Sequence, residues 1–330
     1  MKNKIGLLLT CLITPLTLAS CNNDSNKITV AEVTRSIFYA PMYVALNEGY
    51  FEENGLDVTL ITTPGSDKTM AALLSKEAQI GLMGPETTIY VYNNGQEDYA
   101  INFAQLTQKD GSFLVSREYY EYGKFDFDKL IGASIIGGRK GGMPEMILEY
   151  VLKQKGYEVS NSDETAEIFI RTDVNFDVMA GAFASGNDDF VTLFEPSATE
   201  MENLNEGYIV ESIGEHCGNI PYTCFASLKS YFEGNDKQLE KFVNALKMGL
   251  DYVHTHTPLE IANVIVDSFP STQISTIEKV LARYKSIDAW TSDLMMTPEG
   301  FEKLQDVLKA ANELTNKVDY ETLVTTKYLD

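Results

Sequence analysis

Histidine, cysteine and tryptophan are scarce in this chain of 330 residues, which has three histidines, four cysteines and one tryptophan. No histidine pair has the spacing of a zinc-protease motif, and the sequence has neither a nucleophile elbow nor a glycine-rich dinucleotide motif. Many hydrolase and dehydrogenase sites are thereby excluded. We therefore expect a protein that binds a ligand without a cofactor, and an enzyme is kept as an alternative.

Basic residues are also few, with 26 lysines and arginines against 48 acidic residues and a formal net charge of −22. A surface of this charge repels nucleic acid and anionic lipid headgroups. Nucleic acid is therefore not an expected partner, and the charge itself indicates mainly a well-solvated surface.

Long apolar runs are missing except at the N-terminus. Lys2 and Lys4 precede the mostly apolar segment 5–18, which is too short to span a bilayer and has the order of a secretory signal peptide. The segment ends in Leu-Ala-Ser-Cys21, which resembles the lipobox of bacterial lipoproteins. We predict a signal peptide over residues 1–20 and lipidation of Cys21, with an ordinary signal peptide as the alternative.

Residues 21–27 are polar and have no hydrophobic period, as expected for a flexible tether. Two or more acyl chains on Cys21 would anchor the protein stably. We therefore expect a protein that is held at the extracytoplasmic face of the cell membrane through its lipid.

Cys217 and Cys224 are the two cysteines that remain after this segment, and they are close together in the sequence CGNIPYTC. An extracytoplasmic pair can form a disulfide, but two buried thiols are equally consistent with the sequence. His216 beside Cys217 does not make a metal site, because structural zinc is held by four well-spaced ligands. No metal is expected.

Strand and helix patterns alternate along the chain and then become helical. Apolar and β-branched patterns predict strands at 28–33, 56–61, 78–83, 100–105, 112–116, 134–136, 166–171, 190–194 and 209–213. Proline and glycine bound the predicted helices between these strands. Apolar residues three and four apart predict helices over 239–254, 258–267, 274–285 and 298–315.

Two strand–helix series followed by a helical tail predict an α/β fold with two doubly wound lobes. Lobe one is predicted to comprise 28–116 and 223–330, with the tail packed back on it, and lobe two is predicted to comprise 117–222. The hinge is expected near 116–119 and 222–226. The ligand would then lie between the lobes, where the strands of open α/β sheets end.

Residues 31–58, with Glu-Gly-Tyr-Phe at 48–51 and Gly-Leu-Asp-Val at 55–58, resemble the opening of a bacterial solute-binding family. This family serves ABC importers of nitrate, alkanesulfonates, taurine and thiamine pyrimidine precursors. Residues 80–87, 129–139 and 194–196 also resemble it. The resemblance implies a type II periplasmic-binding-protein fold, a small-molecule ligand, and permease and ATPase subunits as partners. We expect the protein to be a monomer.

Two loops of the first lobe are predicted to reach the ligand. Ser36, Phe38 and Tyr39 lie between the first strand and the first helix, and the two rings either stack on a flat ligand or pack beneath the helix. The second loop starts a helix and contributes Gly84, Glu86 and Thr87. A sulfonate or nitrate would bind at this helix N-terminus, and Glu86 would repel it.

The second lobe is predicted to contribute a glycine-rich turn and a strand end. The turn holds Gly138, Arg139, Lys140 and Gly141; its glycines permit close backbone approach, and its cations pair with a ligand anion or with Glu86, or are simply solvated. Glu195 would be held extended by the proline that follows, and would accept hydrogen bonds from a ring amino group.

Tyr222 begins the return to the first lobe and is a further candidate wall, whereas Trp290 is expected in the core or at an edge and not at the ligand. The runs 36–39, 84–86 and 137–142 resemble most closely the branch of the family that binds pyrimidines. The clustered cysteines of the eukaryotic precursor synthases on the same fold are missing, and no histidine lies in these loops. We therefore predict a receptor for a thiamine pyrimidine precursor or a similar nitrogen heterocycle, with a sulfonate, taurine or nitrate receptor as the alternative.

Overall fold

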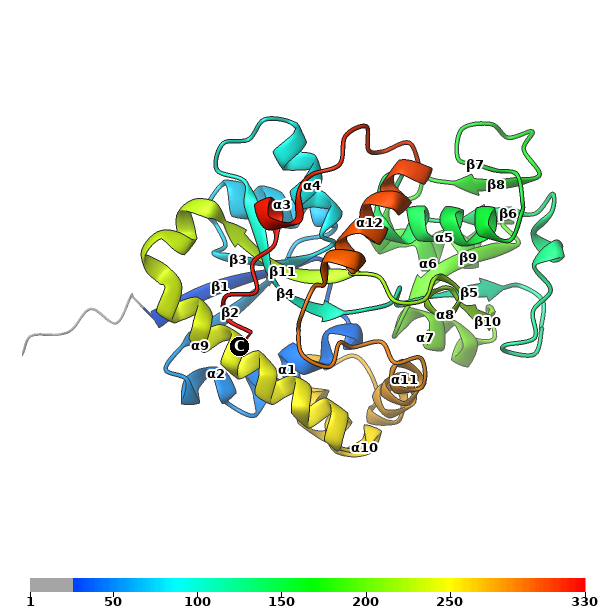
Figure 1. Cartoon of the computed structure of the whole chain (residues 1–330). Coiled ribbons are helices and arrows are strands. Elements are labelled where there is room, and N and C mark those ends of the chain that lie inside the picture. The colour runs from blue at the N-terminus through cyan, green and yellow to red at the C-terminus, as the bar shows by residue number, and fades with distance from the viewer. Residues whose placement is uncertain (1–25, 330) are drawn as a thin grey trace, which may run out of the picture.

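Two α/β lobes lie side by side in the computed structural model, which describes residues 26–329 (Figure 1). The predicted signal peptide and Cys21 lie outside the described residues. Within the described part of the chain, no helix has both the length and the apolar character that crossing a membrane requires.

The first lobe is built on a five-stranded sheet with the order β2-β1-β3-β11-β4. Its strands are β1 (Lys27–Glu32), β2 (Asp57–Thr62), β3 (Ile80–Met83), β4 (Ala100–Thr107) and β11 (Thr223–Leu228). β1 pairs in parallel with β2 and β3, whereas β11 runs antiparallel to β3 and β4. β4 thus runs in the same direction as β1, β2 and β3, so four parallel strands end at the same edge of this sheet.

Helices cover both faces of the first sheet (Figure 1). Those of the first half of the chain are α1 (Ala40–Asn47), α2 (Tyr50–Glu53), α3 (Ser66–Leu74) and α4 (Glu86–Asn93). Met70 and Leu73 of α3 pack in a small apolar cluster of their own, separate from the main core that contains α1. The sheet is therefore buried from two sides, as expected for a largely parallel sheet.

The second lobe has a six-stranded sheet with the order β10-β5-β9-β6-β8-β7. Its strands are β5 (Ser112–Ser116), β6 (Ser134–Ile136), β7 (Val159–Ser160), β8 (Ile168–Arg171), β9 (Phe190–Phe194) and β10 (Tyr208–Ser212). Its helices are α5 (Met143–Gln154), α6 (Met179–Ser185), α7 (Ser197–Leu204) and α8 (Ile213–Cys217).

β5 differs from the expectation, because the sequence analysis assigned residues 112–116 to the first lobe. All five residues of this strand are buried, and the strand pairs antiparallel with β9 and β10 in the second sheet. The chain therefore crosses between the lobes at 108–111 and returns at 218–222, so the first crossing precedes the predicted hinge at 116–119. The two crossings lie side by side, since Ile220 donates its N–H to the carbonyl of Gln108 at 2.8 Å.

The helical tail contacts both lobes. It comprises α9 (Lys229–Thr255), which is kinked at Glu233–Asn235, then α10 (Pro258–Ile265), α11 (Ile274–Ser286), α12 (Pro298–Ala310) and α13 (Tyr320–Leu323). α9 packs on α1, whereas Lys279 of α11 pairs with Glu202 of the second lobe at 3.0 Å. Lys303 of α12 donates to the carbonyl of Cys217 at 2.7 Å. The tail thus joins the two lobes in addition to packing on the first.

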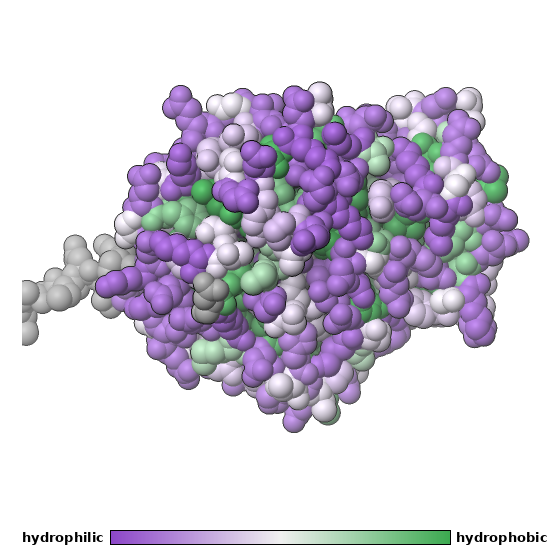
Figure 2. Space-filling model, in the orientation of Figure 1, coloured by the Kyte–Doolittle hydropathy of each residue, from purple (hydrophilic) through white to green (hydrophobic). Residues whose placement is uncertain are grey.

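The tryptophan and the two cysteines of the described chain are buried, and the face of the molecule in Figure 2 is mainly hydrophilic. Trp290 is buried and donates its indole N–H to the carbonyl of Phe38 at 2.8 Å. Cys217 and Cys224, whose state the sequence left open, are two free, buried thiols. Figure 2 shows a mainly hydrophilic face on which apolar residues form small separate areas.

Candidate functional site

A pocket lies between the lobes at the ends of their strands. It has a free volume of about 600 Å³, its open mouth included. The loops after β1, β2, β3, β6 and β8 and the end of β9 contribute its walls, together with the second crossing. Its lining residues are Val33, Thr34, Tyr39, Gly65, Ser66, Gly84, Glu86, Arg139, Gly142, Met143, Pro144, Phe176, Phe194, Tyr222 and Thr223. The pocket therefore has the position that open α/β sheets give to a ligand.

Glu86 is the buried charged group in this wall. It is the first residue of α4, its side chain is 1% exposed, and no residue of the described chain hydrogen-bonds either carboxyl oxygen through a side chain. Burial raises its pKa to about 7, and this rise is opposed by its own backbone N–H and by the charge of Arg139. Glu86 is thus a buried acid whose acceptor capacity the protein leaves largely unused.

Gly84 makes room for this carboxyl. A Cβ atom at Gly84 would lie only 2.0 Å from a Glu86 carboxyl oxygen, so any side chain at this position would displace Glu86. The N–H of Gly84 is held by the hydroxyl of Ser66 at 3.1 Å, and Thr87 donates its hydroxyl to the carbonyl of Gly84 at 2.7 Å. Thr87 therefore supports the turn from behind and does not line the pocket.

Aromatic residues form other parts of the pocket wall. Phe194 lies 5.5 Å from Phe176 and 6.1 Å from Tyr222 between ring centroids. Tyr39 reaches the pocket from the first lobe, and burial raises the pKa of its hydroxyl well above the ordinary range. The pocket therefore offers a flat ligand aromatic rings from both lobes.

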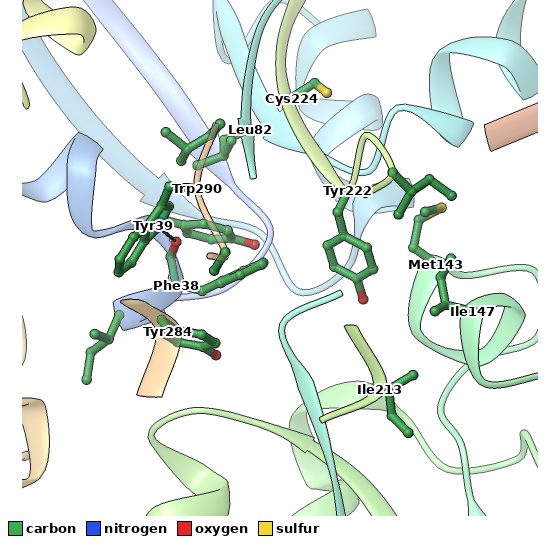
Figure 3. Packing of buried hydrophobic residues seen from close by; sticks show 14 of the residues in the cluster. Phe38, Tyr39, Leu82, Met143, Ile147, Ile213, Tyr222, Cys224, Tyr284 and Trp290 are labelled. Atoms are coloured by element: carbon green, nitrogen blue, oxygen red, sulfur yellow. Dashed lines mark hydrogen bonds between the residues drawn. The ribbon is translucent and has the colours of Figure 1, made fainter. Parts of the chain in front are cut away.

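Phe38 and Ser36 lie behind the wall. Phe38 is fully buried, with its ring centroid 4.9 Å from that of Tyr284, and thus follows the packing alternative of the sequence analysis. Figure 3 shows the rings of Phe38, Tyr39, Tyr284 and Trp290 gathered on one side and Tyr222 on the other. Ser36 donates its hydroxyl to the carbonyl of Glu195 at 2.9 Å, so it ties the first lobe to the second.

Glu195 is fully engaged by other residues of the chain. Its carboxylate accepts the N–H of Thr199 at 2.8 Å and the Thr199 hydroxyl at 2.9 Å, and it forms a buried ion pair with Arg283 of the tail. Burial raises the pKa of Glu195, and Arg283 and Thr199 oppose this rise. The expected role as a free acceptor for a ligand amino group does not fit this arrangement, because Glu195 lies outside the pocket wall and its oxygens have partners.

The glycine-rich turn brings one of its two cations to the pocket. Gly138 and Gly141 have φ angles of 95° and 71°, which residues with a side chain rarely adopt. They turn the chain so that Arg139 lines the pocket. Lys140 is exposed and lies outside the pocket wall. Gly141 donates its N–H to Glu145 at 3.2 Å and accepts the Tyr90 hydroxyl at 3.2 Å, so it serves as a further contact between the lobes.

Of the predicted residues, Tyr39, Gly84, Glu86, Arg139 and Tyr222 come together around the pocket. Sequence reasoning missed Phe176 and Met143, which no local motif singles out, and also Phe194, which stands directly before Glu195. Among residues 26–329, no group of three or more His, Cys, Asp and Glu residues is arranged to hold a metal ion.

The comparisons with known proteins agree with this architecture. The NMT1/THI5-like family model matches residues 37–259. The Bacillus subtilis protein YtlA is 43% identical over 309 residues, which are 93% of this chain and 90% of YtlA.

Solved structures give the fold. The alkanesulfonate-binding protein SsuA from Xanthomonas axonopodis pv. citri, bound to MOPS, has a TM-score of 0.71 at 13% identity, and the match covers 91% of this chain and 98% of SsuA. The Candida albicans CA3427 product, described with the generic periplasmic-binding-protein fold, has a TM-score of 0.65 at 15% identity over 92% of this chain and 97% of that one. The predicted fold class is thereby confirmed, and the chain belongs to the NMT1/THI5-like family.

Proposed function

We propose that this protein is the extracytoplasmic solute-binding receptor of an ABC importer and that it captures a small nitrogen heterocycle, such as a thiamine pyrimidine precursor, between its lobes. Its partners would be a permease and an ATPase, and lipidated Cys21 would hold it at the membrane. The name of YtlA as a binding protein and the alkanesulfonate-binding function of SsuA support the receptor class. Binding without chemical conversion is part of this proposal.

The proposed ligand class rests on the carboxyl of Glu86, whose oxygens accept no hydrogen bond from a side chain of the described residues. Both of its oxygens are buried in the pocket wall without a side-chain donor from the described residues. A buried polar group without a partner costs about 1–3 kcal/mol, and a ligand that brings N–H donors would remove this cost. An aminopyrimidine has such donors at its edge and a flat face for Tyr39, Phe194 and Tyr222.

A sulfonate, taurine or nitrate is the second candidate, and Arg139 is the observation in its favour. Arg139 lines the pocket, and an anion would pair with its guanidinium. Its side chain is 45% exposed, however, and its nearest acid is Asp67 of the first lobe at 3.9 Å. A partly solvated cation attracts an anion weakly, whereas buried Glu86 in the same pocket would repel it.

Native mass spectrometry of the freshly purified protein tests this proposal, because a co-purified ligand would be identified by its mass. We expect a small molecule with ring nitrogen and a bound fraction that falls in Glu86→Gln. A sulfonate or taurine retained by the wild type, and retained more fully by Glu86→Gln, would contradict the heterocycle.

A further inference from the structure

Asp110 is a buried acid in the first crossing, outside the set of pocket residues. It is 0% exposed, and it lies between β4 and β5 where the chain passes from one lobe to the other. One carboxyl oxygen accepts the N–H of Ser112 at 2.6 Å, whereas the other has no hydrogen-bond partner in the described chain. A carboxyl in this position is costly unless a neighbour uses its second oxygen.

Two hydroxyls lie near this carboxyl. The hydroxyls of Ser112 and Tyr222 are also buried without a hydrogen-bond partner among residues 26–329. Burial raises the pKa of Asp110 to about 7, and the side chains of Ser112 and then Tyr222 lower it, so both hydroxyls are close to the carboxyl. Three buried polar groups thus face one another without being fully paired.

Tyr222 extends this group to the ligand pocket. Its ring is part of the pocket wall, and it stands in the second crossing, where its N–H donates to the carbonyl of Thr107 at 3.2 Å. Figure 3 shows its hydroxyl pointing away from Tyr39 and Phe38, toward Ile213. One end of Tyr222 therefore lies at the pocket, and the other end lies near Asp110 of the first crossing.

We propose that Asp110 is a positioning residue for ligand capture: its carboxyl holds the hydroxyl of Tyr222, and so links the pocket wall to both crossings between the lobes. When Asp110 is protonated, its O–H donates to one of the two hydroxyls. When it is ionised, it accepts from Tyr222 or Ser112. Either state of Asp110 allows this contact, but the direction of the hydrogen bond reverses as Asp110 titrates.

The other titratable groups around Asp110 come from α8, α11 and the pocket. Cys217 of α8 and Tyr284 of α11 have pKa values that burial raises, and the charge of Asp110 raises both of them further. On the pocket side, the charges of Tyr39 and Glu86 add to the rise that burial causes in the pKa of Tyr222. Lys303 lies near Cys217, and no cation among residues 26–329 lowers the pKa of Asp110. Among these groups, Cys217 and Tyr284 keep their protons near neutral pH, whereas the pKa values of Asp110 and Glu86 lie near 7.

The single tryptophan gives a readout that needs no ligand. Trp290 pairs with Thr107 at the start of the first crossing, and its ring centroid lies 6.1 Å from that of Tyr284. Tyr284 in turn donates its hydroxyl to the carbonyl of Gly111, the neighbour of Asp110. A change in the charge of Asp110 should therefore alter the fluorescence of Trp290.

A pH titration of Trp290 fluorescence tests the inference. We expect a transition near pH 7 in the wild type that is lost in Asp110→Asn and retained in Glu86→Gln. Because both hydroxyls lower the pKa, Ser112→Ala and Tyr222→Phe should move the midpoint upward, and Ser112→Ala should move it further. A transition that keeps its full size and midpoint in Asp110→Asn, or a midpoint that neither hydroxyl deletion moves, would overturn the inference. The two hydroxyl variants keep it testable if Asp110→Asn fails to fold.

A double-mutant cycle tests the link to ligand capture, and this part rests on the proposed function. Asp110→Asn and Tyr222→Phe should each weaken binding of a hydroxymethyl-aminopyrimidine by roughly 3- to 10-fold, and the double variant should bind no more weakly than the weaker single variant. Additive losses would contradict the link. If the wild type does not bind this probe, the ligand proposal fails, while the fluorescence titration still decides the role of Asp110.

Discussion

Replacing Glu86 by glutamine should reduce the pH dependence of stability. The folded protein keeps the proton of this buried carboxyl up to about pH 7, whereas the unfolded chain releases it near the ordinary value of 4.5. The folded state therefore binds more protons between these two values. The free energy of unfolding falls as pH rises from 4.5 to about 7, and the contribution of Glu86 is constant above that.

The magnitude follows from the two pKa values. One pKa unit corresponds to about 1.4 kcal/mol, so ionised Glu86 destabilises the fold by about 3 kcal/mol at high pH. Roughly 1 kcal/mol of this is already present at about pH 5.5. Between about pH 5.5 and about pH 8.5, the wild type should therefore lose about 2 kcal/mol more stability than Glu86→Gln. The burial cost of the glutamine amide does not change with pH, so it cancels in this comparison.

Equilibrium urea unfolding of both proteins at the two pH values measures this difference. Glu77→Gln is the matched control, because Glu77 is an exposed carboxyl in the same lobe, and this variant should follow the wild type. If the wild type and Glu86→Gln lose the same stability between the two pH values, Glu86 titrates like a solvated acid. The argument that it is a buried acceptor without a partner would then be refuted.

Three further predictions concern the anchor, the tail and closure. Cys21→Ser should release the protein from the membrane fraction, and a variant that stays there at wild-type size would contradict the lipid anchor. Glu195→Gln should lower the free energy of unfolding by about 3 kcal/mol, because it breaks the buried pair with Arg283, while Glu200→Gln on the exposed side of α7 should have little effect; equal losses would contradict a structural role for Glu195. Small-angle scattering should give a smaller radius of gyration with saturating ligand than without, and an unchanged profile would argue against hinge closure.

The parts of the site that depend on local sequence patterns could be predicted from the sequence. Gly84 and Glu86 stand at a strand-to-helix turn, and the position of such turns in an α/β lobe follows from the order of strands. The glycines that flank Arg139 likewise signal a turn whose backbone needs positive φ. These positions could be predicted because the order of strands and the residues that form turns can both be recognised from short stretches of sequence.

The remaining features depend on contacts between distant segments. Arg283 is 88 residues from Glu195, and no local pattern indicates that it neutralises that carboxylate. The strand at 112–116 has the same apolar pattern whichever sheet it joins, so its place beside β9 required the structure. Whether Phe38 faces a ligand or the core was open for the same reason, because both environments favour a large apolar ring.

Calorimetric titration of the wild type and Glu86→Gln with a hydroxymethyl-aminopyrimidine and with taurine tests the central claim most directly. A hydrogen bond to a charged acceptor is worth about 1.5–3 kcal/mol, and about 1.4 kcal/mol is a tenfold change in affinity. We predict that the wild type binds the aminopyrimidine, that Glu86→Gln binds it roughly 10- to 100-fold more weakly, and that neither protein binds taurine tightly. Tight binding of taurine by the wild type, strengthened in Glu86→Gln, would contradict the account.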